Sequence, residues 1–166
     1  MRFPPLLAAI LLLAGNAPGR AAPPPVEEAW LTPAERAGFD ATPSLAETGA
    51  YLDRLAGRLP MLRIEPFGLS GAGRTMTVAI VSPDGAFTPA AAAATGRPVV
   101  LVLNGIHAGE IDGKDATLAL LRDAALGRRP DLFAGLTLLV VPVYNVDGHE
   151  RVSPWNRPSQ DGPRAG

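Results

Sequence analysis

Two strongly apolar segments constrain the fold of this 166-residue sequence more than any other feature. They cover residues 99–103 and 136–143, and neither alternates apolar with polar side chains. Such runs are typical of strands that are buried on both faces of a sheet. The residues between them predict a helix over 113–126, which Asp112 caps and Gly127 ends. A strand, a helix and a strand at this spacing predict a right-handed βαβ unit in a largely parallel sheet.

The region before this unit predicts one more helix and two more strands. Thr42 followed by Pro43 is typical of a helix start, and an apolar stripe predicts a helix over roughly 43–57. Strands are predicted at 64–67 and 75–81, joined by a glycine-rich turn. We therefore predict an α/β domain with a mixed, mostly parallel sheet flanked by helices.

The first 41 residues predict two segments that precede this domain. Residues 1–21 have the layout of a signal peptide, with a positive start, an apolar run and small residues near Ala21. The apolar run is too short for a membrane span, which needs about 20 residues. Residues 22–41 begin with three prolines and are interpreted as a linker or arm. We expect an exported protein, periplasmic or secreted, without stable membrane insertion after cleavage, whose domain covers 42–166.

Charge and cysteine content exclude several classes of protein. The formal net charge is −1, which gives no electrostatic reason to expect a nucleic acid as partner. The sequence contains no cysteine, so neither a disulfide framework nor a lipidated cysteine is available. The folded domain must therefore depend on its apolar core.

A histidine and a carboxylate follow the first apolar strand. Ligands of open α/β sheets collect beyond the carboxyl ends of the strands, and the loop that carries His107 and Glu110 lies there. The two residues are three positions apart on a tight turn, so both side chains can point to one side. An imidazole nitrogen and a carboxylate oxygen suit zinc. Alternatively, His107 caps a helix and Glu110 is a solvated residue of its first turn.

Three short motifs carry a resemblance to a known family. They are GIHAGE at 105–110, NVDG at 145–148 and NR at 156–157. In this order and spacing they resemble the zinc metallocarboxypeptidases, the carboxypeptidase A-like family. The resemblance covers roughly residues 40–166 and departs from the family at Val146, where many members carry proline. It implies the N-terminal part of a carboxypeptidase-like domain, truncated at its C-terminal side.

The resemblance implies one zinc ion, with His107 and Glu110 as the first two ligands. The third ligand, a histidine, and the catalytic glutamate are expected beyond residue 166. No catalytic residue is therefore assigned within this chain, and its substrate-binding residues are unknown. Some members of the family carry a side chain beside the substrate path at the position of Gly109. Its absence here is expected to affect subsite preference. Arg157 and Arg164 are interpreted as loop salt-bridge partners.

His149 offers an alternative third ligand. The sequence has two histidines, and counting ligands alone would join His107, Glu110 and His149 into one metal-binding set. In the resembling family this position is not a ligand, so we interpret His149 as a loop residue in a region, from 145 onward, that is predicted to be irregular.

The function that the resemblance implies is removal of C-terminal residues from peptides. A related alternative is a zinc-dependent acyl-amino-acid deacylase, and a non-catalytic alternative is an exported peptide-binding remnant. The chain by itself is expected to be inactive, with apolar strand faces exposed to water.

Overall fold

The computed structural model describes residues 24–129 and 131–153. Its helices and strands, in chain order, are η1 (Glu28–Trp30), α1 (Pro33–Arg36), α2 (Leu45–Ala56), β1 (Leu62–Leu69), β2 (Thr75–Val81), α3 (Pro89–Ala94), β3 (Val99–Leu103), α4 (Asp112–Ala125), β4 (Thr137–Val141) and α5 (Val146–His149).

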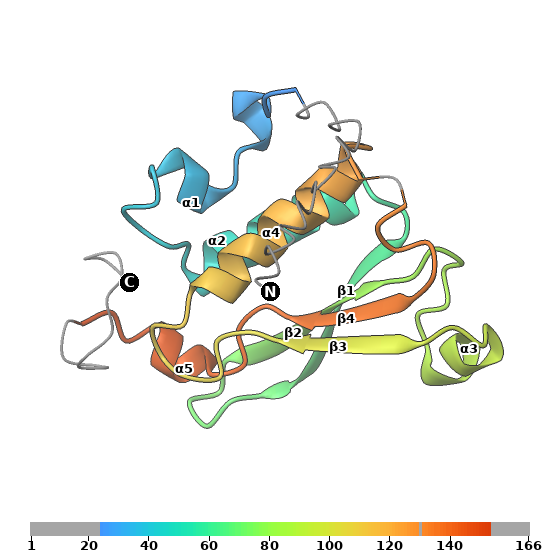
Figure 1. Cartoon of the computed structure of the whole chain (residues 1–166). Coiled ribbons are helices and arrows are strands. Elements are labelled where there is room, and N and C mark those ends of the chain that lie inside the picture. Colours follow the sequence, from blue (N-terminus) through green and yellow to red (C-terminus); the bar gives the residue numbers. More distant parts are fainter. Residues whose placement is uncertain (1–23, 130, 154–166) are drawn as a thin grey trace, which may run out of the picture.

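The four described strands form one mixed sheet in the order β1-β2-β4-β3 (Figure 1). β3 and β4 pair in parallel and are connected through α4, which is the predicted βαβ unit. β1 and β2 pair antiparallel, and so do β2 and β4. The fold class of a mixed sheet with flanking helices is confirmed. Among the described strands one pairing of three is parallel. The short turn between β1 and β2 makes that pair an antiparallel hairpin.

α2 begins later than the sequence predicts. The Oγ of Ser44 accepts a hydrogen bond from the Glu47 N–H at 3.2 Å, and the Glu47 carboxylate accepts one from the Ser44 N–H at 2.9 Å. This reciprocal capping box makes Ser44 the N-cap, and Thr42 is not used as one. Hydrogen bonds from Ser44 lower the pKa of Glu47. The hydroxyl of Thr42 instead donates to the carboxylate of Asp115 in α4.

The apolar core lies between the sheet and the two long helices. α2 and α4 cover the same face of the sheet (Figure 1). Their fully buried leucines pack against the inner side chains of the strands, and the most buried members of this core are Leu52, Leu55, Leu118, Leu121 and Val81. Burying a side chain of this size stabilises the fold by about 1.5–3 kcal/mol. This core fixes the carboxyl ends of β3 and β4 relative to α4.

β3 is not buried on both faces in this chain, as expected for apolar strand faces exposed to water, whereas β4, for which the same exposure was expected, is largely buried. β4 lies between β2 and β3 and is largely buried, whereas β3 is the last strand of the sheet. Val99 is 51% exposed and Leu101 is 55% exposed, while the side chain of Val102 packs against the core. The apolar run therefore predicts the strand correctly, but it does not predict how much of the strand is buried.

The described part of the predicted linker or arm, from residue 24, folds onto the helices. Thr32 and Ala34 are buried, and the capping box of Thr32 and Glu35 starts α1. The buried guanidinium of Arg122 in α4 binds the Glu35 carboxylate. The hydroxyl of Tyr51 donates to the Trp30 carbonyl at 2.8 Å. None of the helices in the described part of the chain is long and apolar enough to cross a membrane.

Candidate metal centre

The candidate site is the loop 104–111, which leads from the carboxyl end of β3 into α4. Two of its glycines have positive φ angles, 57° at Gly105 and 81° at Gly109. At Gly105 a Cβ would lie 3.4 Å from the Cγ1 of Val143, so glycine also permits the close approach of the neighbouring loop.

Backbone hydrogen bonds join this loop to the segment that follows β4. The Tyr144 N–H donates to the Asn104 carbonyl at 2.8 Å, and the Asn145 N–H donates to the Gly105 carbonyl at 2.9 Å. The parallel pairing of β3 and β4 thus continues beyond the strands themselves. The first residues of the candidate loop are held by the backbone of their neighbour.

The side chain of Asn104 adds a second constraint on the loop. Its Nδ2 donates to the Thr117 hydroxyl of α4 at 3.0 Å. A Cβ at Gly113 would lie 2.5 Å from the Asn104 Oδ1, so α4 can receive this amide because residue 113 is glycine. The amide therefore ties the start of the loop to the helix that follows it.

His107 and Glu110 come together as predicted. The Nδ1 of His107 lies 2.9 Å from the Oε1 of Glu110, and the His107 N–H donates to the Glu110 Oε2 at 3.2 Å. Their side chains are 61% and 36% exposed, so the pair is open to a ligand. The pair offers an imidazole nitrogen and a carboxylate oxygen side by side, which are ligand types that zinc takes, so the two residues would fit a zinc ion.

The described residues contain no group of three or more His, Cys, Asp or Glu side chains that could hold a metal ion. The motif residues 156–157 and Arg164 lie outside the described residues, as does the predicted signal peptide.

His149 does not join the candidate site, and its surroundings differ from the prediction. It lies at the end of α5 and not in an irregular loop, and its side chain is 9% exposed. Its Nε2 lies 2.9 Å from the Nζ of Lys114, and its Nδ1 lies 3.1 Å from the Oε1 of Glu150. Burial and the nearby Lys114 charge lower the pKa of His149. Both ring nitrogens are therefore engaged by protein groups.

Lys114 is the residue that sequence reasoning missed. It is fully buried in the first turn of α4, and burial lowers the pKa of its amine to about 8. Lysine is almost never fully buried unless it is paired. The available signal was spacing, because Lys114 lies four residues before Leu118 and seven before Leu121, on the apolar stripe of the helix.

Asp147 of the NVDG motif serves as a structural tie. Its carboxylate accepts hydrogen bonds from the Arg74 guanidinium at 2.7 Å, the Ser70 hydroxyl at 2.8 Å and the Ala72 N–H at 3.0 Å. The hydrogen bonds from Arg74 and Ser70 lower its pKa. Asn145 accepts from the Gly148 N–H at 2.9 Å and caps α5. The motif thus joins the β1–β2 turn to the segment beside the candidate loop.

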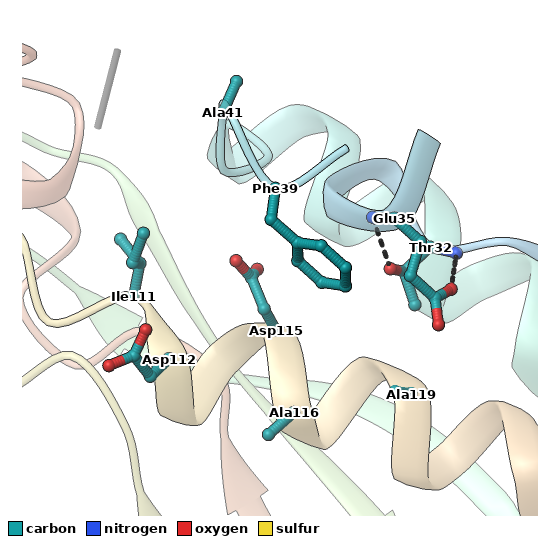
Figure 2. Close-up of a pocket in the computed structure, with 9 residues that line it drawn as sticks. All are labelled: Thr32, Glu35, Phe39, Ala41, Ile111, Asp112, Asp115, Ala116 and Ala119. Carbon is teal, nitrogen blue, oxygen red and sulfur yellow. Dashed lines mark hydrogen bonds between the residues drawn. The ribbon is translucent and has the colours of Figure 1, made fainter. Parts of the chain in front are cut away.

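Two hollows adjoin α4. One, of about 300 Å³, lies between the arm and α4 and is lined by Asp112 and Asp115 but by neither His107 nor Glu110. Figure 2 shows Asp115 and Phe39 in this hollow, and burial raises the pKa of the Asp115 carboxyl. The other, of about 170 Å³, is lined by Gly109 of the candidate loop together with His149 and Glu150.

Comparison with known proteins places this geometry in a family. The sequence profile of the family described as zinc carboxypeptidase matches residues 48–163. No curated protein matches the chain significantly.

Solved structures show the same fold. Carboxypeptidase A from Helicoverpa armigera has a TM-score of 0.56 and 27% identity, over 68% of this chain and 26% of its own. Bovine thrombin-activatable fibrinolysis inhibitor, in complex with tick carboxypeptidase inhibitor, has a TM-score of 0.55 and 20% identity, over 77% and 37%. A metallo-carboxypeptidase from Burkholderia cenocepacia has a TM-score of 0.51 and 22% identity, over 64% and 28%. The chain thus spans between 26% and 37% of the length of these three proteins.

Proposed function

Because the chain belongs to the zinc carboxypeptidase family, we propose that it forms part of a zinc-dependent enzyme that removes C-terminal residues from peptides. The observation that carries this proposal is the convergence of His107 and Glu110, 2.9 Å apart and exposed, within the segment that matches the family. The chemistry of the pair fits zinc, and its place at the carboxyl end of β3 fits a ligand site of an α/β sheet.

His107 and Glu110 would hold one zinc ion, which supplies a Lewis acid for a peptide carbonyl when it is bound. The chain's own contribution is to place these two side chains. The backbone hydrogen bonds at Asn104 and Gly105 set the start of the loop, and α4 sets its end. We propose that a third histidine ligand and the general base lie outside this sequence, together with the groups that bind the peptide terminus.

The proposed site is tested by replacing its two ligands in the full-length protein that contains these residues. His107→Ala and Glu110→Gln are each expected to reduce bound zinc and the release of C-terminal amino acids from short peptides. Asp112→Asn is the matched control for Glu110→Gln, because it removes an exposed carboxylate two residues further on. Full zinc content and full activity in both ligand variants would contradict the assignment.

The substrate class is tested in the same preparation. Short peptides with free carboxyl ends are compared with N-acetylated and N-succinylated amino acids. Release of the terminal residue from peptides supports the carboxypeptidase, and turnover of the acylated amino acids alone would indicate the deacylase. Stoichiometric peptide binding without turnover would indicate a binding protein.

We also propose that the protein is exported, on the basis of residues 1–21. N-terminal sequencing of protein recovered from the periplasm or the medium is expected to show a start near Ala21. An intact Met1 on a cytoplasmic product would contradict export.

A further inference from the structure

The buried amine of Lys114 belongs to a closed ring of hydrogen bonds beside the candidate site. It donates to the Pro43 carbonyl and lies 2.9 Å from the Nε2 of His149. The Oε1 of Glu150 lies 3.1 Å from the Nδ1 of His149 and accepts from the Leu45 N–H at 3.0 Å. The backbone from Pro43 to Leu45, at the start of α2, closes the ring.

The donors and acceptors of this ring define the tautomer of His149. A lysine ammonium group has three donors and no acceptor, so the Nε2 of His149 must accept from Lys114. The proton of the neutral imidazole then lies on Nδ1 and is donated to Glu150. Lysine and histidine side chains on different elements are thereby fixed in one orientation.

The ring is connected to the candidate loop at the loop's far end. Lys114 follows Glu110 by four residues, in the first turn of α4. The start of the loop is bonded to Tyr144 and Asn145, which directly precede α5, and His149 ends α5. The segment 144–150 therefore holds loop 104–111 at both ends. In the middle of the loop, Gly109 lines a hollow together with His149 and Glu150.

We propose that Lys114 and His149 are positioning residues, which set the conformation in which loop 104–111 presents His107 and Glu110. This inference rests on the proposed zinc site. A role in stability alone does not explain the choice of lysine, because replacing a buried charged group by an apolar side chain of similar volume is often neutral or stabilising. What an apolar side chain cannot supply is the directional bond to His149.

The test uses the full-length protein and three variants. Lys114→Met removes the amine but keeps the volume, and His149→Leu removes the acceptor. His149→Gln is the matched control, because its amide oxygen can accept from Lys114 at the position of Nε2. Zinc affinity is measured by chelator competition, and amide hydrogen exchange of residues 105–111 is measured in the metal-free protein.

We expect Lys114→Met and His149→Leu to weaken zinc binding by about 10- to 100-fold, as for groups that orient metal ligands. Exchange of the loop amides should accelerate, while exchange in α2 and β4 stays at the wild-type rate, which shows that the variants are folded. His149→Gln should remain close to wild type in both measurements. Wild-type loop exchange in Lys114→Met and His149→Leu, or equal losses in His149→Leu and His149→Gln, would overturn the proposal.

Two further readouts separate this proposal from the zinc assignment. The exchange measurement needs no metal, so accelerated exchange supports the positioning role even if His107→Ala leaves zinc binding intact. The ¹⁵N chemical shifts of the His149 ring are expected to show a proton on Nδ1 in the wild type. A proton on Nε2 would overturn the ring as described.

Discussion

β3 and β4 are neighbouring parallel strands of similar apolar composition, yet they lie in opposite surroundings. In β4, Val140 is 1% exposed and Val141 is 4% exposed. In β3, Leu101 is 55% exposed and Leu103 is 46% exposed. The difference follows from position, because β4 lies between β2 and β3, whereas β3 pairs with β4 alone among the described strands.

The contrast shows that an apolar run predicts a strand suited to burial, and not whether the strand is buried in this chain. A long exposed apolar strand at a sheet edge is an aggregation hazard that natural proteins usually cover or interrupt with charges. β3 carries no charged residue. Its composition therefore suits burial beneath further chain, and the match covers 26% and 37% of the chains of two of the relatives. We expect the two strands to become alike in a protein whose further segments cover β3.

The largest effect is expected from shortening a leucine in β4. Leu138→Ala removes a side chain that is 6% exposed and should lower the free energy of unfolding by about 2–5 kcal/mol. Leu101→Ala in β3, in a chain that ends at Gly166, should change it by less than about 0.5 kcal/mol. Urea titrations of both variants give the comparison. Equal losses in this chain would contradict the environment described for β3.

The sequence carried enough information to predict the strands, α4 and the joining of His107 with Glu110. Each of these depends on local pattern, such as the apolar run before the loop and the three-residue spacing within it. The difference in burial between β3 and β4 could not be predicted, because it depends on which chain segments lie beside each strand. Lys114, and its contact with His149, were missed for a related reason. Their partners come from residues 35 to 71 positions away, and no local pattern records that contact.

The next effect tests the proposal that β3 is covered in a longer protein that contains this chain. There, Leu101→Ala should cost about 2 kcal/mol, as expected for a buried leucine. Leu101→Lys should be more damaging still, because a buried unpaired charge is strongly unfavourable. In the chain that ends at Gly166 the same lysine should instead raise solubility without loss of stability. Sedimentation and urea titration distinguish the cases, and a neutral effect of Leu101→Lys in both proteins would mean that β3 stays exposed.

The smallest effect is expected from two exposed ion pairs, one near β4 and one near β3. They allow the two strands to be compared without a contribution from apolar burial. Asp147, beside the end of β4, accepts from three donors, one of them the guanidinium of Arg74. Asp84 pairs with Arg97, which lies just before β3. Asp147→Asn should therefore destabilise the protein slightly more than Asp84→Asn. Both losses should shrink at high salt, because exposed pairs are screened.

Asp147 is expected to stabilise the folded protein in a way that depends on pH. Its hydrogen bonds lower the folded-state pKa, so the stabilisation is complete above the unfolded-state pKa of about 3.9. It disappears as the pH falls through the lower pKa of the folded state, where the protonated carboxyl resembles asparagine in charge. Thermal unfolding of wild type and Asp147→Asn should differ at pH 7 and converge in acid. A difference that stays constant with pH would assign the effect of Asp147 to the shape of the β1–β2 turn and not to its charge.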